Sequence, residues 1–133
     1  MKKYSLLIFF ISIVHLGLHA QSKIEINVIA KTLINDENIF ITGNNEQLGN
    51  WNPYKVKLDK INDSTWSKIF YFDVGVQIEF KFTLGSWENE ALGTNDEILS
   101  NSIVKINSDT SLVFIITKWG SAKIKFSGQI TGN

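Results

Sequence analysis

The chain has 133 residues, of which 44% are hydrophobic and 20% are charged, and it contains no cysteine. Without cysteine no disulfide can form, so burial of apolar side chains must stabilise the fold. Basic and acidic residues balance at a formal net charge of zero, and no basic stripe runs along the chain. Nucleic acid is therefore not an expected partner.

The first twenty residues have the pattern of a secretory signal peptide. Lys2 and Lys3 give a basic start, an apolar run covers 6–18, and the small residue Ala20 precedes Gln21. Such a run is too short to span a bilayer, which takes about twenty residues. We therefore expect export by the Sec route of a bacterium, a secreted or periplasmic location, and no membrane association after cleavage.

Removing residues 1–20 limits the chemistry that remains. Both histidines and the only methionine leave with this segment, so the mature chain has neither His nor Cys. Triads built on His or Cys and most zinc sites are thereby excluded, and we expect no cofactor and no metal. The eleven remaining lysines face thirteen acidic residues, and the 113 residues from 21 onward fit one domain of ordinary size.

Short segments of alternating apolar and polar residues predict β-strands along most of the mature chain. The segment 77–84 is the clearest: Ile78, Phe80 and Phe82 are expected to face the core, and Lys81 the solvent. Residues 111–117 are apolar on both faces, which predicts a strand in the middle of a sheet or beneath a loop. In chain order the predicted strands are 23–30, 38–43, a weaker 54–59, 64–72, 77–84, 102–107 and 111–117.

No window has sustained helical periodicity, and only 87–99 could hold a helical turn. Several short strands at regular spacing, separated by turn residues, predict an all-β fold of the sandwich type. The end of the chain, 121–133, is predicted to be a last strand fragment or a linker.

Two tryptophans lie in predicted loops. Trp51 stands within "GNNEQLGNWNP", which is otherwise mostly turn residues, and Trp87 follows the strand 77–84 in "GSWENE". An exposed indole is a flat, rigid plate that matches the apolar face of a pyranose ring, and Lys81 and Glu88 could bond the surrounding hydroxyls. The alternative is that each indole anchors its loop by folding back onto the sandwich, as we expect for Trp66 and Trp119.

An acidic stretch offers a different hypothesis. Glu88, Glu90, Asp96 and Glu97 could supply the two carboxylates of a glycosidase. A carboxylic acid needs a pocket that raises its pKa, and a domain of this size has little material for one. A solvated acidic loop is the favoured interpretation.

Taken together, "IFITGNNEQLGNWNP", "TWSKIFYF", "IEFKFTLGSWENE", "SNSIVKIN" and "LVFIITKWG" resemble the starch-binding domains of carbohydrate-binding module family 20. The related glycogen-binding modules are similar as well. The resemblance extends from about residue 23 to residue 120, within a predicted module of 21–120. It implies an immunoglobulin-like antiparallel β-sandwich of about seven to eight strands.

The resemblance also implies a glucan site made of two tryptophans and a lysine. The tryptophan of the L-G-x-W turn corresponds to Trp51, the lysine of the E-x-K-F strand to Lys81, and the second tryptophan with its glutamate to Trp87 and Glu88. In the family an asparagine before an arginine follows. Here Asn101 precedes a serine and the loop is longer, so Asn95 is an alternative for that place.

Secreted bacterial esterase-like proteins begin with a similar module and continue into an α/β-hydrolase domain, so a catalytic domain outside this chain is a possible partner. The chain has no G-x-S-x-G motif, so it should not itself be an esterase. The first hypothesis is a secreted non-catalytic module that recognises α-glucan of the starch or glycogen type. The second is a structural or docking domain without sugar binding, and the third, much weaker, is the glycosidase.

Overall fold

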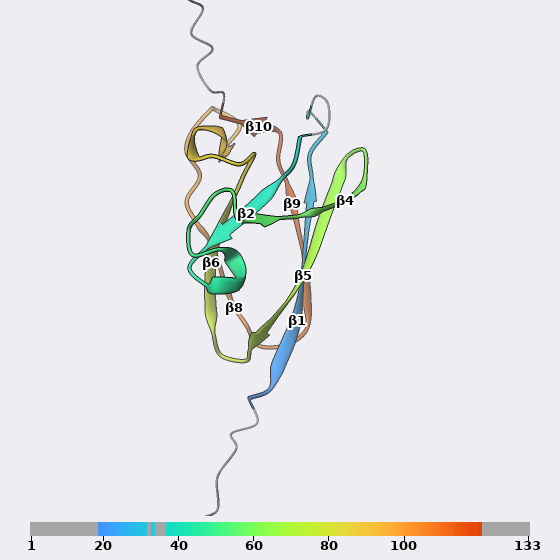
Figure 1. Cartoon of the computed structure of the whole chain (residues 1–133), viewed down its shortest axis with the longest axis vertical. Helices are drawn as coiled ribbons and strands as arrows, with labels where there is room; N and C mark the ends of the chain where they lie inside the picture. Colours follow the sequence, from blue (N-terminus) through green and yellow to red (C-terminus); the bar gives the residue numbers. More distant parts are fainter. Residues whose placement is uncertain (1–18, 32, 34–36, 121–133) are drawn as a thin grey trace, which may run out of the picture.

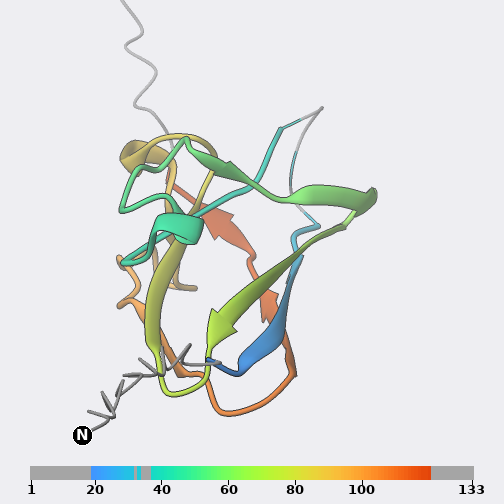
Figure 2. The same cartoon turned by 60° about the horizontal axis from the view of Figure 1, so that its bottom comes forward.

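The computed structural model describes residues 19–31, 33 and 37–120, which form two facing β-sheets (Figures 1 and 2). Sheet A contains, in spatial order, β4 (Asp59–Asn62), β5 (Thr65–Asp73), β1 (Gln21–Ile29) and β9 (Thr110–Ile115). Sheet B contains β3 (Val56–Lys57), β2 (Phe40–Gly43), β6 (Gln77–Thr83) and β8 (Ser102–Lys105). Sheet C pairs β7 (Ala91–Leu92) with β10 (Lys118–Trp119), and two short 3₁₀ turns complete the described part, η1 (Glu46–Leu48) and η2 (Trp87–Asn89).

This architecture confirms the predicted all-β sandwich. Within the described ranges, seven strands are longer than two residues, and β3, β7 and β10 are two-residue pairings. Neighbouring strands are antiparallel except β1 and β9, which run parallel. A parallel pair needs a crossover connection rather than a tight turn, and here the whole of sheet B lies between the two strands in sequence.

The core forms where the inward rows of the two sheets meet. On β6, Ile78, Phe80 and Phe82 are buried, as the alternation predicts. The Phe114 ring of β9 lies 5.5 Å from that of Phe80 and 5.1 Å from that of Phe82, which joins sheet A to sheet B. Each fully buried phenylalanine contributes about 2–3 kcal/mol of hydrophobic stabilisation.

The prediction for 111–117 is wrong. The strand there, β9, is at the edge of sheet A, and the side chains of Val113 and Ile115 are 61% and 74% exposed. Leu112 and Phe114 point inward, whereas Val113 and Ile115 share the outward face with Asn27 and Ile29 of β1. The apolar residues on the outward face of this strand are therefore exposed to solvent and not covered by another segment of the described chain.

The weak strand 54–59 divides between the two sheets. β3 pairs with β2 in sheet B, whereas β4 pairs with β5 in sheet A. Leu58, between them, is 1% exposed, and its N–H donates to the Ile39 carbonyl oxygen at 2.9 Å. The chain changes sheets at this buried leucine, and β4 then extends to Asn62, beyond the end of the predicted strand.

The remaining predicted elements agree with the structure or lie outside the described residues. Trp66 is 2% exposed and Trp119 is partly buried, so both pack as expected. The segment 87–99 holds η2 and β7. The predicted signal peptide, apart from His19 and Ala20, and the tail 121–133 lie outside the described residues; within the described ranges no helix is long and apolar enough to cross a membrane.

Candidate functional site

The loop that carries Trp51 begins where β2 ends. Gly43 packs directly on β6, because a Cβ there would overlap the carbonyl oxygen of Glu79 and lie 2.9 Å from Leu48 Cδ1. The 3₁₀ turn η1 follows, capped by the Asn45 side chain, which accepts a backbone N–H of the turn at 2.8 Å. Leu48 is fully buried and anchors the turn to the core.

Three consecutive residues with left-handed backbone then bring Trp51 back to the sheet. Gly49, Asn50 and Trp51 have φ of 80°, 50° and 61°. Such a conformation costs a residue with a side chain about 1–2 kcal/mol, so the surroundings must impose it. The Trp51 N–H donates to the Gly43 carbonyl oxygen at 2.8 Å, which fixes the backbone of Trp51 against the end of β2.

The Trp51 side chain is partly buried. Among buried side-chain nitrogen and oxygen atoms of the described ranges, only Thr42 Oγ1 and Trp119 Nε1 lack a partner. Trp51 Nε1 has no protein acceptor within the same ranges, and if it were buried it would be a third such atom. This nitrogen therefore contacts solvent. Trp51 therefore combines a supported position with an open hydrogen-bond donor.

Trp87 is more exposed than Trp51. β6 ends at Thr83, the chain turns through Gly85 at φ 104°, and Trp87 opens η2. The N–H of Leu84 donates to the Asn89 carbonyl oxygen at 3.0 Å, which closes the turn. The Trp87 side chain is 42% exposed, so it does not plug the sandwich as the anchor alternative required.

The two tryptophan loops are tied to each other. Thr83 Oγ1 donates to the Pro53 carbonyl oxygen at 2.7 Å and accepts the Gly85 N–H at 3.1 Å. Pro53 follows Trp51 by two residues, and Gly85 precedes Trp87 by two. Figures 1 and 2 both show the segment after η1 running beside the η2 turn, so the fold brings the two predicted platforms to one end of sheet B.

Lys81 lies on the outward face of β6 between these loops, but it has a partner that the sequence analysis missed. Its Nζ is 2.8 Å from Glu90 Oε2, and the two side chains are only 17% and 12% exposed. Thr83 pairs with Glu90 across the turn, which makes Lys81 the diagonal neighbour of Glu90. An ammonium has three donors, so Lys81 keeps donors for a ligand while Glu90 holds it in place.

The other predicted site residues are less closely joined to the indoles. Glu88 is exposed beside Trp87. Asn101 Nδ2 donates to Glu79 Oε2 at 3.4 Å, at the outward side of β6. Asn95 lies in an exposed turn, where its N–H donates to a carboxylate oxygen of Glu97 at 2.8 Å. Within the described ranges no hydrogen bond links Asn95 or Asn101 to either tryptophan, so their roles stay predictions.

Residues 118–120, at the end of the described chain, contact the loop that follows Trp87. Gly120 packs against the carbonyl group of Glu88, where a Cβ would overlap the oxygen, and its N–H donates to the Glu90 carbonyl oxygen at 2.8 Å. Lys118 forms an exposed ion pair with Asp96 at 2.9 Å. β10 thus fixes the long loop that the sequence analysis treated as an acidic stretch, and no cluster of potential metal ligands occurs in the described ranges.

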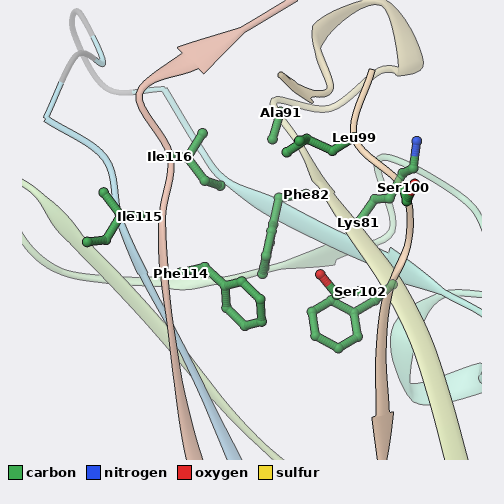
Figure 3. A pocket seen from close by; sticks show the side chains of 10 residues that line it. Lys81, Phe82, Ala91, Leu99, Ser100, Ser102, Phe114, Ile115 and Ile116 are labelled. Atoms are coloured by element: carbon green, nitrogen blue, oxygen red, sulfur yellow. The ribbon is translucent and has the colours of Figure 1, made fainter. Parts of the chain in front are cut away.

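An apolar cleft lies under the stem of Lys81, at the open edge between β8 and β9 (Figure 3). It has a volume of about 100 Å³, and Leu99, Phe82 and Phe114 line it. Figure 3 shows the Lys81 nitrogen at the side of the cleft rather than within it. Only Ser100 and Ser102 contribute hydroxyl groups, so the cleft lacks the polar partners that a sugar requires.

Comparison with known proteins shows the family of the chain. A family model described as a starch binding domain matches residues 21–113, which is most of the chain. An amylopullulanase from Thermoanaerobacter thermohydrosulfuricus is 26% identical over 106 residues. That match covers 77% of this chain but 7% of the amylopullulanase, so the chain spans a small part of that relative.

Solved structures share the fold. The family 20 carbohydrate-binding module of the maltotetraose-forming amylase from Pseudomonas saccharophila STB07 matches with a TM-score of 0.52 at 18% identity, over 71% of this chain and 99% of that one. The gamma-CGTase from alkalophilic Bacillus clarkii matches with a TM-score of 0.50 at 19% identity, over 74% of this chain and 15% of that one. These likenesses confirm the β-sandwich.

Proposed function

Because this chain belongs to the starch-binding domain family, we propose that it is a secreted module that holds α-glucan of the starch or glycogen type by stacking glucose units on Trp51 and Trp87. Lys81 donates hydrogen bonds to sugar hydroxyls, and Glu88 and neighbouring asparagines add others. The observation that supports this most is the joining of the two tryptophan loops through Thr83, since one glucan chain can reach both indoles only if they lie at one end of the sheet.

The expected affinity is modest. Covering one indole with a sugar removes about 50–80 Å² of apolar surface, or about 1–2 kcal/mol. Two indoles and a few hydrogen bonds of about 1 kcal/mol each give a Kd in the micromolar to millimolar range. Such affinities suit a polymer ligand, on which weak contacts add through avidity.

Titration of the purified protein with maltoheptaose, and electrophoresis through native gels containing soluble starch, test this proposal. Trp87→Ala should weaken binding about tenfold and abolish retardation by starch. Tyr71→Ala is the matched control, because Tyr71 is 53% exposed on the outward face of sheet A and should leave binding unchanged. Equal binding by wild type and Trp87→Ala, or no binding by wild type, would refute the proposal.

A starch-binding domain is non-catalytic, so the chain is not an enzyme. Two of the four carboxylates of the glycosidase hypothesis are also in ion pairs. Glu90 is paired with Lys81, and Asp96 with Lys118. Release of reducing sugar from starch by this chain is therefore not expected.

Secretion is supported by the sequence of residues 1–20 and by the start of the family match at residue 21. β1 also begins at Gln21, so cleavage before this residue leaves the first strand whole. Mass spectrometry of the protein from the culture medium or periplasm should find Gln21 as the first residue. A protein that retains residues 1–20 in the cell would contradict this part of the proposal.

The outward face of sheet A favours docking against a catalytic domain as a second function. Ile69 and Tyr71 on β5 and Val113 and Ile115 on β9 are between 45% and 74% exposed there, on either side of the polar residues Glu25 and Asn27 of β1. If wild type fails to bind starch while Ile69→Lys or Val113→Lys abolishes association with an α/β-hydrolase domain, docking without sugar binding becomes the better assignment.

A further inference from the structure

The side chain of Tyr54 is the most exposed aromatic group among the large hydrophobic residues of the described ranges, at 71%. Exposed tyrosines are common on protein surfaces, but this ring is supported from below. It stacks on the ring of Phe40, with centroids 5.2 Å apart and planes inclined by 26°. Phe40 belongs to β2 and is itself buried, so one face of the tyrosine rests on the sandwich.

Gly85 also makes room for the ring. A Cβ at Gly85 would lie 3.3 Å from Tyr54 Cδ2, and its φ of 104° disfavours any side chain there. The Tyr54 N–H donates to Asn52 Oδ1 at 3.0 Å, which fixes the backbone. With Phe40 on one side and the exposed fraction so high, the other face of the ring is open to solvent as a preformed flat surface.

The position of this surface connects it with the proposed glucan site. Tyr54 follows Trp51 by three residues, so their Cα atoms are at most about 11 Å apart. The ring also touches Gly85, two residues before Trp87. The Tyr54 hydroxyl has no protein hydrogen-bond partner in the described ranges and is free to bond a sugar hydroxyl at the edge of the plate.

We propose that Tyr54 is a third stacking platform, which extends the site by a further glucose unit and makes the module selective for longer α-glucan chains. This inference rests on the proposed function, since it lengthens the same site. Tyrosine suits the task because it offers a large apolar face at little cost in conformational entropy, together with a polar edge.

The test is a calorimetric series from maltose to maltoheptaose on wild type, Tyr54→Ala, Tyr54→Phe and Tyr54→Leu. In wild type the affinity should rise with chain length until the oligosaccharide reaches Tyr54. Tyr54→Ala should leave maltose binding within twofold and weaken maltoheptaose about tenfold. Tyr54→Phe should keep most of the gain with length. Tyr54→Leu still covers Phe40 but lacks a flat ring, so it should behave as Tyr54→Ala even if the alanine variant is poorly folded.

The outcomes separate this inference from the proposed function. If Trp87→Ala weakens every oligosaccharide but Tyr54→Ala and Tyr54→Leu weaken none, or weaken all equally, Tyr54 is not an added platform and only this inference fails. If wild type binds no α-glucan of any length, both fail.

Discussion

The two tryptophan loops at the end of sheet B are built in different ways. The Trp51 loop is held by its own backbone: a glycine with no room for a side chain, a capped 3₁₀ turn, and a left-handed Trp51 bonded to Gly43. The Trp87 loop has no side-chain cap on its 3₁₀ turn; the local bond from the Leu84 N–H to the Asn89 carbonyl oxygen closes it, and Gly120, distant in sequence, packs against it. In the proposed glucan site, a rigid Trp51 loop would thus lie beside a more exposed Trp87, whose position depends on Glu90 and β10.

The largest effect is expected in the Trp51 loop. Gly43→Ala places a methyl group against the backbone of Glu79 and the side chain of Leu48, and the backbone cannot move aside. We expect a loss of about 3 kcal/mol in the free energy of unfolding, measured by urea denaturation. Gly75→Ala is the control for crowding, because no atom lies within 4 Å of the added Cβ; only its φ of 93°, which Gly43 does not share, opposes a side chain there. It should lose only about 1 kcal/mol, and an equal loss would contradict the crowding argument.

The second largest effect on the free energy of unfolding is expected at the Trp87 loop. Glu90→Ala leaves the mostly buried ammonium of Lys81 without its partner, which should cost about 2 kcal/mol, between the values for surface and for fully buried pairs. Lys118→Ala, which breaks the exposed pair with Asp96, should cost less than about 0.5 kcal/mol.

A double variant then separates stability from binding. Lys81→Met with Glu90→Leu should recover most of the lost stability, because an apolar pair can replace a buried ion pair, but it should not recover glucan affinity. Full affinity in this double variant would show that Lys81 does not bond the sugar.

The smallest effect distinguishes the two indoles directly. Trp51→Ala removes a partly buried side chain, so it should lower the free energy of unfolding by about 1 kcal/mol as well as weaken glucan binding. Trp87→Ala removes an exposed side chain and should change stability by less than about 0.5 kcal/mol. Thermal melts of the two variants check this, and equal melting temperatures would mean that the loops do not differ in the way described.

The strands were predictable because alternation is a local signal. The segment 77–84 buries Ile78, Phe80 and Phe82, and 64–72 buries Trp66, Phe70 and Phe72. Burial of such alternate residues requires a pleated strand. The tryptophans in turn-rich segments were equally visible, and so was the likeness to a starch-binding domain. Tyr54 could have been singled out by the same reasoning, because it follows Pro53 in the Trp51 loop, but its support by Phe40 depends on pairing between strands.

What the sequence determined by itself is therefore the sandwich, its inward rows and the two loop tryptophans. Only the tertiary structure decided that β9 is an edge strand, that Lys81 is bound by Glu90, and that the Trp51 and Trp87 loops meet through Thr83. The physical reason is range: the period of a strand is set by neighbouring residues, whereas strand order, ion pairs and loop contacts join residues that only the folded chain brings together.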